Sequence, residues 1–128
     1  MRQRGFTLLE LIVVLAILGL ATALVAPSML RGIDSWQRQA AIDVLLDDLR
    51  ALPGEARARG TEIVLDAEAL QQPEPPLKVA GDWQLQVPEP WRVGSNGVCQ
   101  GGEVIISNSY GSRTIEVAAP FCDPRVLP

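Results

Sequence analysis

The residues that could carry chemistry in this 128-residue chain are few, and the sequence contains no histidine. A Ser-His-Asp triad, a His-ligated zinc site and a haem on a proximal histidine are therefore excluded. The adjacent carboxylates Asp47 and Asp48 point about 100° apart on a helix, so they do not converge on one substrate and we expect a solvated face. Residues 94–97, Gly-Ser-Asn-Gly, lack the Gly-Lys-Ser/Thr ending of a phosphate loop and are typical of a turn. The sequence thus predicts a protein that is not an enzyme and holds no metal or other cofactor.

The charge balance is acidic, with 11 Lys and Arg against 15 Asp and Glu and a formal net charge of −4. Binding of nucleic acid requires a concentrated basic face. Beyond Arg92 the basic residues are Arg113 and Arg125. Nucleic acid is therefore an unlikely partner.

Residues 11–30 form a run of 20 residues without a charge. A helix of that length spans about 30 Å, which matches the hydrocarbon core of a bilayer. A cleaved secretory signal is the alternative, but its apolar region is usually about 7–15 residues and ends at a small-x-small site. The alanines Ala21, Ala23 and Ala26 do not end this run cleanly. We therefore expect a retained, single membrane-spanning helix.

The basic residues Arg2 and Arg4 precede the apolar run, and positive flanks stay in the cytoplasm. The rest of the chain then lies outside the membrane, in a periplasm if the cell is a Gram-negative bacterium. Cys99 and Cys122 agree with an oxidising compartment, since two cysteines allow one pairing. A bridge closing a loop of this size would stabilise the fold by about 3 kcal/mol. Two reduced, buried thiols are the alternative.

Apolar residues recur at helical spacing after the run, which predicts an amphipathic continuation of the same helix. They form two sets: Ile33, Trp36, Ala40 and Val44, and then Ala41, Leu45, Leu49 and Leu52. Pro27 should kink or locally melt the helix, because proline lacks a donor and clashes with the preceding turn. Pro53 and Gly54 should end the helix or bend it sharply, with a further turn before Gly60 stops it.

Beyond Gly60 the pattern predicts short strands. Residues 62–66 read as one strand, residues 71–76 as a proline-rich loop, and the alternation of Trp83, Leu85 and Val87 as a half-buried strand.

A hairpin is expected from two further strands, residues 103–107 and 114–118, and Pro120 should end the second one. Because so small a sheet cannot enclose a sizeable hydrophobic core alone, it should pack on the helix around residues 36–52. The three tryptophans are interpreted as core: Trp36, Trp83 and Trp91.

Residues 1–10, Met-Arg-Gln-Arg-Gly-Phe-Thr-Leu-Leu-Glu, resemble the class III leader of type IV pilins and type II secretion pseudopilins. In that pattern a short basic leader ends in Gly, and Phe-Thr-Leu-x-Glu opens an apolar helix. The resemblance covers residues 1–30 and extends to the proline at Pro27. It implies cleavage between Gly5 and Phe6 by a prepilin peptidase, followed by N-methylation of Phe6.

Glu10 stands at the head of the apolar run, where a carboxylate needs a partner or must take up a proton. Cleavage would create the nearest amine, on Phe6. The resemblance implies that Glu10 meets the terminal amine of a neighbouring subunit and so sets axial register during assembly. The alternative is a glutamate at headgroup level that is satisfied by water.

The fold class that follows is α+β and pilin-like, with a long N-terminal helix packed on a small antiparallel head. The domains are a leader (1–5), a transmembrane and filament-core helix (6–30), its amphipathic continuation (31–60) and a periplasmic β-rich head (61–128).

Parts of residues 48–60 and 101–126 are similar to the GspH/FimT group of minor pseudopilins and pilins. This implies a minor pseudopilin, a structural subunit of the periplasmic pseudopilus that helps the type II secretion system export folded proteins. The alternative is a FimT-like minor type IV pilin that acts in pilus assembly or DNA uptake. The implied partners are the prepilin peptidase/methyltransferase, other major and minor pseudopilins, the inner-membrane assembly platform and, before assembly, the lipid bilayer.

Overall fold

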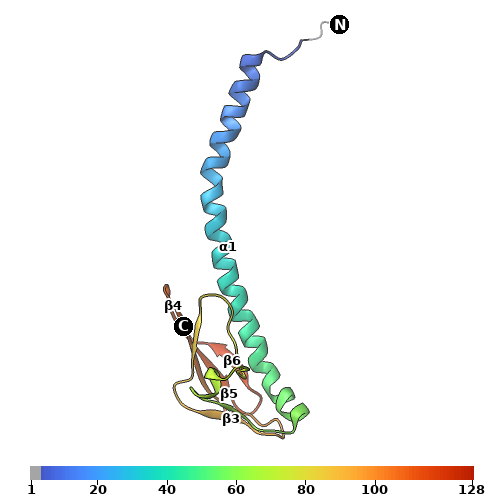
Figure 1. Ribbon diagram of the computed structural model, residues 1–128, viewed down its shortest axis with the longest axis vertical. Helices are drawn as coiled ribbons and strands as arrows, with labels where there is room; N and C mark the ends of the chain where they lie inside the picture. The colour runs from blue at the N-terminus through green and yellow to red at the C-terminus, as the bar shows by residue number, and fades with distance from the viewer. Residues whose placement is uncertain (1–3) are drawn as a thin grey trace. The chain divides into compact units, whose positions relative to one another are not determined.

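The computed structural model describes residues 4–128, and its longest element is the helix α1, Leu8–Arg59, of 52 residues. The chain divides into two units, Met1–Gln37 and Arg38–Pro128, and α1 contributes residues to both. Figure 1 follows the elements along the chain by colour, with α1 in blue to green and the last strands in orange to red. Arg2, one of the two basic residues of the expected leader, lies outside the described residues.

Helix α1 ends where the sequence predicts. Gly60 adopts a left-handed conformation with φ of +64°, and its N–H donates to the carbonyl of Arg57 at 3.3 Å. Glycine enters this region without a Cβ clash, so it is favoured just past a helix C-terminus. Arg57 and Arg59 lie in the last turn, where positive charge faces the negative end of the helix dipole.

The two prolines of α1 do not interrupt it. The helix continues through Pro27, so local melting at this residue is wrong, while the kink stays a prediction. Pro53 and Gly54 do not end the helix either, so that half of the expectation is wrong, while a sharp bend there stays a prediction. A proline inside a helix costs about 3 kcal/mol, but Leu52, Pro53 and Ala56 are all buried in the head. Burying one leucine side chain stabilises by about 1.5–3 kcal/mol, so packing on the sheet offsets the lost hydrogen bond.

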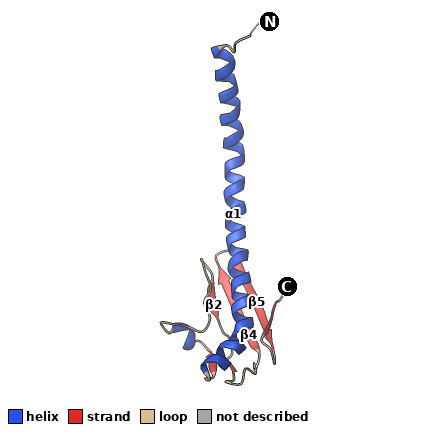
Figure 2. Ribbon diagram, turned by 90° about the vertical axis from the view of Figure 1, so that its right-hand side faces the viewer, coloured by secondary structure: helices blue, strands red, loops and turns tan. Residues whose placement is uncertain are grey.

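The strands form two antiparallel sheets (Figure 2). The smaller sheet pairs β1, Ile63–Leu65, with β3, Trp91–Val93. The larger has the order β2-β4-β5-β6, and its strands are Gln84–Gln86, Gly102–Asn108, Gly111–Ala118 and Asp123–Val126. A short 3₁₀ helix, η1, covers Ala69–Gln71. The predicted α+β class is confirmed.

The predicted hairpin is present as β4 and β5, but its strands are longer and its turn is tighter than expected. Asn108 pairs with Gly111, which leaves only Ser109 and Tyr110 between the strands. The Asn108 side chain explains the short turn, because its Oδ1 accepts the N–H of Tyr110 at 2.9 Å and of Gly111 at 3.2 Å. Asparagine closes turns in this way. Strand β5 ends at Ala118, before Pro120, as predicted.

Two strands, β3 and β6, were not predicted. Pro124 lies within β6, which is at the edge of the larger sheet, where the missing N–H of proline costs no ladder hydrogen bond. Trp91 opens β3, and its indole occupies the space that a Cβ at Gly102 would need. Strand β3 depends on pairing with β1, which is distant in sequence, so a local pattern does not reveal it. Strand β6 pairs with the neighbouring β5, but its four residues include a proline and carry no clear alternation.

The core of Arg38–Pro128 lies between one face of α1 and the sheets. The second of the two predicted helical sets supplies that face, since Ala41, Leu45, Leu49 and Leu52 are buried. Alternate residues of the central hairpin face them: Val104, Ile106, Ile115 and Val117. The predicted packing of helix on sheet is confirmed, and it extends to Ala56.

The first helical set is exposed, so it does not form the face that packs on the head. Val44 is 57% exposed, because it lies about 100° around the helix from the buried Leu45. The interpretation of Trp36 as core is also wrong, since its side chain is 83% exposed and the buried face of α1 begins only at Ala41. Trp91 is 3% exposed and Trp83 packs at the edge of the core, as expected.

Candidate functional site: the helix N-terminus and the disulfide loop

The junction between Gly5 and Phe6 lies just before α1, in a segment without helical or strand structure. The side chain of Phe6 is 87% exposed, and a Cβ added at Gly5 would meet no atom within 4 Å. Nothing in the described chain therefore requires glycine at this position. A requirement for Gly5, if present, must come from an enzyme that binds the segment.

Thr7 caps the start of α1. The backbone N–H of Glu10 donates to Thr7 Oγ1 at 3.2 Å, and the N–H of Leu11 donates to the Thr7 carbonyl at 3.2 Å. Threonine followed three residues later by glutamate is the capping-box pattern, and a cap of this kind stabilises a helix by about 1 kcal/mol. The cap fixes the start of the helix at Leu8 and keeps Phe6 outside it. The sequence analysis missed this role for Thr7, although the Thr-x-x-Glu spacing carries the signal.

The Glu10 carboxylate lies in the first turn of α1 and is exposed. A negative charge is favourable there because the helix dipole is positive at its N-terminus. Within residues 4–128 the ion pairs are Arg50–Asp47 and Arg92–Glu62, so no described cation neutralises Glu10. The carboxylate is thus available to an amine from outside the described chain.

The first part of α1 contains one segment that is long and apolar enough to cross a membrane, and none of it is buried in the structure. Its hydroxyl groups are satisfied within the helix. Thr22 Oγ1 donates to the carbonyls of Leu18 and Gly19 at 3.0 and 2.9 Å, and Ser28 Oγ donates to the carbonyl of Val25 at 2.8 Å. Polar groups in a bilayer must find partners inside the protein, so these residues add little cost to a membrane span.

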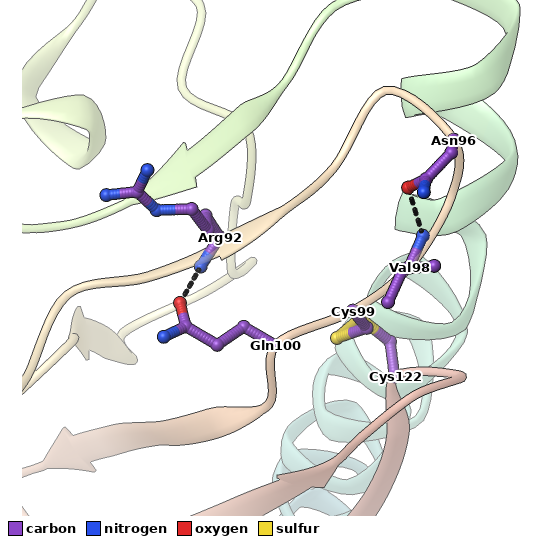
Figure 3. Close-up of a disulfide and its surroundings, with 6 residues drawn as sticks. All are labelled: Arg92, Asn96, Val98, Cys99, Gln100 and Cys122. Atoms are coloured by element: carbon purple, nitrogen blue, oxygen red, sulfur yellow. Dashed lines mark hydrogen bonds between the residues drawn. A yellow bond between two sulfur atoms is a disulfide. The ribbon is translucent and has the colours of Figure 1, made fainter.

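Cys99 and Cys122 form the predicted disulfide, with a Cα–Cα distance of 5.4 Å, and both are buried (Figure 3). The bridge joins the segment between β3 and β4 to the segment between β5 and β6. The N–H of Cys99 also donates to the carbonyl of Pro120 at 2.9 Å. Two connections that are distant in sequence are thereby fastened together.

The disulfide loop, residues 94–101 between β3 and β4, carries Cys99 and is held by local hydrogen bonds. Residues 94–97 form the predicted turn, since the Gly97 N–H donates to the Gly94 carbonyl at 2.8 Å. Asn96 Oδ1 accepts the N–H of Val98 at 3.1 Å, as Figure 3 shows. The left-handed φ of Gly97, +85°, and the guanidinium of Arg57 beside it leave no room for a side chain. The loop therefore has a defined turn whose Gly97 lies beside the Arg57 side chain from the last turn of α1.

Carboxylates line an open groove of about 730 Å³ between the end of α1 and residues 61–78. Two of them have structural partners: Asp66 Oδ1 accepts the N–H of Ala69 at 2.7 Å, and Glu62 pairs with Arg92 at 3.2 Å. Asp47, on the helix, pairs with Arg50 and is solvated, as predicted. Among the described residues, no group of three or more His, Cys, Asp or Glu side chains could hold a metal ion. The carboxylates of the groove whose partners are known thus serve the local structure.

Comparisons with known proteins agree with this reading of the N-terminus. Residues 1–26 match the family model of the prokaryotic N-terminal methylation motif. The chain is similar to type II secretion system core protein G of Pectobacterium carotovorum subsp. carotovorum, at 36% identity over 98 residues, 70% of this chain and 63% of that protein. It is also similar to core protein G of Klebsiella pneumoniae, at 45% identity over 53 residues, 41% of this chain and 35% of that protein.

The chain spans less than two thirds of the length of these two relatives. No solved structure matches it. The methylation motif, the long apolar helix and the antiparallel sheets occur together in one chain. The chain is a pilin-like protein with a prepilin-type N-terminus, related in sequence to type II secretion system core protein G.

Proposed function

We propose that the chain is a pseudopilin, a structural subunit of the periplasmic pseudopilus of the type II secretion system. The observation that carries this proposal is an exposed Gly5–Phe6 junction placed just before a capped helix whose first, membrane-length apolar segment is not buried by any part of the described chain. Such a helix needs an apolar environment from outside, first a bilayer and then a filament core. The similarity to core protein G supports the secretion system as the setting.

Processing is the first step of the proposed role. A prepilin peptidase/methyltransferase cleaves after Gly5 and methylates the new amine of Phe6. The methylation motif over residues 1–26 supports this step, as does the exposure of the junction. Because Thr7 starts the helix independently of the leader, removal of residues 1–5 leaves the cap intact.

The register of assembly is assigned to Glu10. Its carboxylate has no cationic partner within residues 4–128, and it lies at the start of the apolar segment. A neighbouring subunit's Phe6 amine satisfies it in the filament. A subunit that docks out of register leaves both charges unpaired in apolar surroundings, which is unfavourable.

The location follows from the same features. Before assembly, residues 6–30 span the inner membrane with the N-terminus in the cytoplasm and the head in the periplasm. The disulfide supports a periplasmic head, because such bonds persist in oxidising compartments. An inner-membrane assembly platform and other pseudopilins are the partners in the transfer from bilayer to filament.

The finer assignment, a minor rather than a major subunit, is also a proposal. It rests on the similarity of parts of residues 48–60 and 101–126 to the GspH/FimT group, whereas the two relatives carry the name core protein G. Counting the subunit in isolated pseudopili tests it. A minor subunit is present at a small fraction of the number of the main one, and equal or greater abundance contradicts the assignment.

Deletion and complementation test the function as a whole. Loss of the gene should block release of folded exoproteins from the periplasm, and the wild-type chain should restore it. A FimT-like pilin instead loses natural transformation, and its purified head retards DNA in a salt-dependent gel shift. Unimpaired secretion together with lost transformation contradicts the proposal.

A further inference from the structure

Trp36 is a large, mostly apolar side chain that is exposed near the end of the first unit. Its side chain is 83% exposed, so the described residues leave it almost uncovered. Tryptophan is large and mostly apolar and carries one N–H, so it is favoured at boundaries that are apolar on one side and wet on the other. The exposed position of Trp36 is therefore favourable where the helix meets such a boundary outside the chain.

The distance of Trp36 from the apolar run fits the outer surface of a bilayer. Leu30 is the last residue of the uncharged run, so the Cα of Trp36 lies about 9 Å further along the helix at 1.5 Å per residue. The polar layer of one leaflet is roughly 5–8 Å thick. In a helix the Cα–Cβ bond tilts toward the N-terminus, so the side chain covers the turn before its own Cα. The indole is thereby directed back toward the lipid and into the headgroup layer.

The residues around Trp36 fit the same boundary. Arg31 is the first charged residue after the run, at the level where a guanidinium can reach lipid phosphates while its stem stays in apolar surroundings. Ile33 lies between them and is also exposed, at 53%. Past the first charge, Ile33 and Trp36 thus alternate with the polar residues Asp34 and Ser35, which is the mixed composition of a headgroup layer rather than of the hydrocarbon core.

From these positions we propose that Trp36, with Arg31 and Ile33, anchors the helix in the headgroup layer on the periplasmic side of the inner membrane. The partner is the phospholipid surface. The anchor fixes the depth of the span before assembly, so that Glu10 stays at the opposite surface. This inference rests on the membrane residence given under the proposed function, and it adds the residue that sets depth.

Fluorescence quenching by brominated lipids tests the anchor in the full chain. The protein is reconstituted in phosphatidylethanolamine and phosphatidylglycerol vesicles whose acyl chains carry bromine either near the glycerol or near the middle. Wild type should lose emission to the shallow bromines and much less to the deep ones. Trp36→Phe should abolish that loss, whereas the matched variant Trp83→Phe, in the head, should keep it.

Flotation of the same vesicles separates failure of the anchor from failure of the span. A chain that floats with the lipid but shows equal quenching in wild type and Trp36→Phe overturns the anchor and leaves the membrane span standing. A chain that does not float overturns both. If Trp36→Cys cross-links to another pseudopilin while wild type in vesicles shows no lipid quenching, the indole belongs to a subunit interface and the anchor is wrong.

Discussion

In the unit Arg38–Pro128 the apolar residues of α1 face either a buried core or solvent, whereas in Met1–Gln37 every described side chain is exposed. Both regions use the same helix, and both are rich in Leu, Ile, Val and Ala. The head has its own antiparallel sheets and a disulfide to enclose its apolar face. The described residues of the first unit have neither, and their apolar surface is open to the lipid and the neighbouring subunits of the proposed function. The stability of the head is therefore internal, whereas the role proposed for the first unit depends on contacts with other molecules.

The largest effect is expected at the Gly5–Phe6 junction, where the comparison predicts lost function without lost folding. Gly5→Arg should leave the leader on and abolish filament entry, because the peptidase no longer accepts the site. Intact mass of the membrane form checks this: wild type should lack residues 1–5 and carry one added methyl group. Gly5→Ala, which adds one methyl group where the chain has open space, serves as the control and should be processed. A wild-type chain that keeps its leader, or is cleaved near Ala26, contradicts the account.

The next effect concerns the core, where two adjacent residues of α1 give a matched pair. Leu45→Ala should lower the free energy of unfolding of the head by about 2–5 kcal/mol, because it leaves a cavity at a fully buried site. Val44→Ala, at an exposed site, should change it by no more than about 0.5 kcal/mol. Denaturant titration of the detergent-solubilised chain, followed by the fluorescence of Trp83 and Trp91, measures both. Equal effects would mean that the head does not pack on this face of the helix.

The disulfide should contribute a similar or slightly smaller amount to the free energy of unfolding of the head. Cys122→Ser should destabilise the head by about 2–4 kcal/mol, because the unfolded chain loses a constraint over 23 residues. Reductant should lower the melting temperature of wild type to that of the variant and leave the variant unchanged. Thiol labelling of the denatured, unreduced wild type should find neither cysteine reactive. Ready labelling there would show that the bond is absent.

The smallest effect is expected at the helix cap. Thr7→Ala removes the acceptor of the Glu10 N–H and should destabilise the first turn by about 1 kcal/mol. Amide exchange at Glu10 should speed up in micelles, with no change in the unfolding of the head. Thr7→Ser keeps the hydroxyl and should exchange like wild type. Unchanged exchange in Thr7→Ala would show that the cap does not hold the helix start.

Sequence patterns predicted best the features that depend on neighbours in the chain. The apolar run, the stop at Gly60, the hairpin and the single cysteine pairing all follow from local rules. Helical spacing gave two apolar sets on α1, and only tertiary contact decided that the set containing Leu45 is buried and that Val44 and Trp36 are exposed. Pro53 stays helical for the same reason. Its neighbours Leu52 and Ala56 are buried against strands that lie much later in the sequence.

At the candidate site, too, local sequence patterns identify some features and only the three-dimensional structure reveals others. Gly5, Phe6 and Glu10 could be named from the leader pattern, and the structure adds the geometry around them. The capping role of Thr7 was not predicted, because the leader pattern marks the carboxylate of Glu10 whereas the cap depends on the backbone N–H of that residue. The exposure of Trp36 could not be foreseen, because a tryptophan at helical spacing is as compatible with a core as with a membrane surface.

The central claim is that the first unit acts through contacts with neighbouring subunits, and Glu10 tests it most directly. Cysteine cross-linking between this chain and other pseudopilins is compared for wild type and Glu10→Leu, with secretion measured in the same cells. The account predicts that Glu10→Leu is made, cleaved after Gly5 and retained in the membrane, yet cross-links poorly and secretes poorly, with Glu10→Asp intermediate. Equal cross-linking and equal secretion in wild type and Glu10→Leu would contradict it and leave the carboxylate merely solvated at the membrane surface.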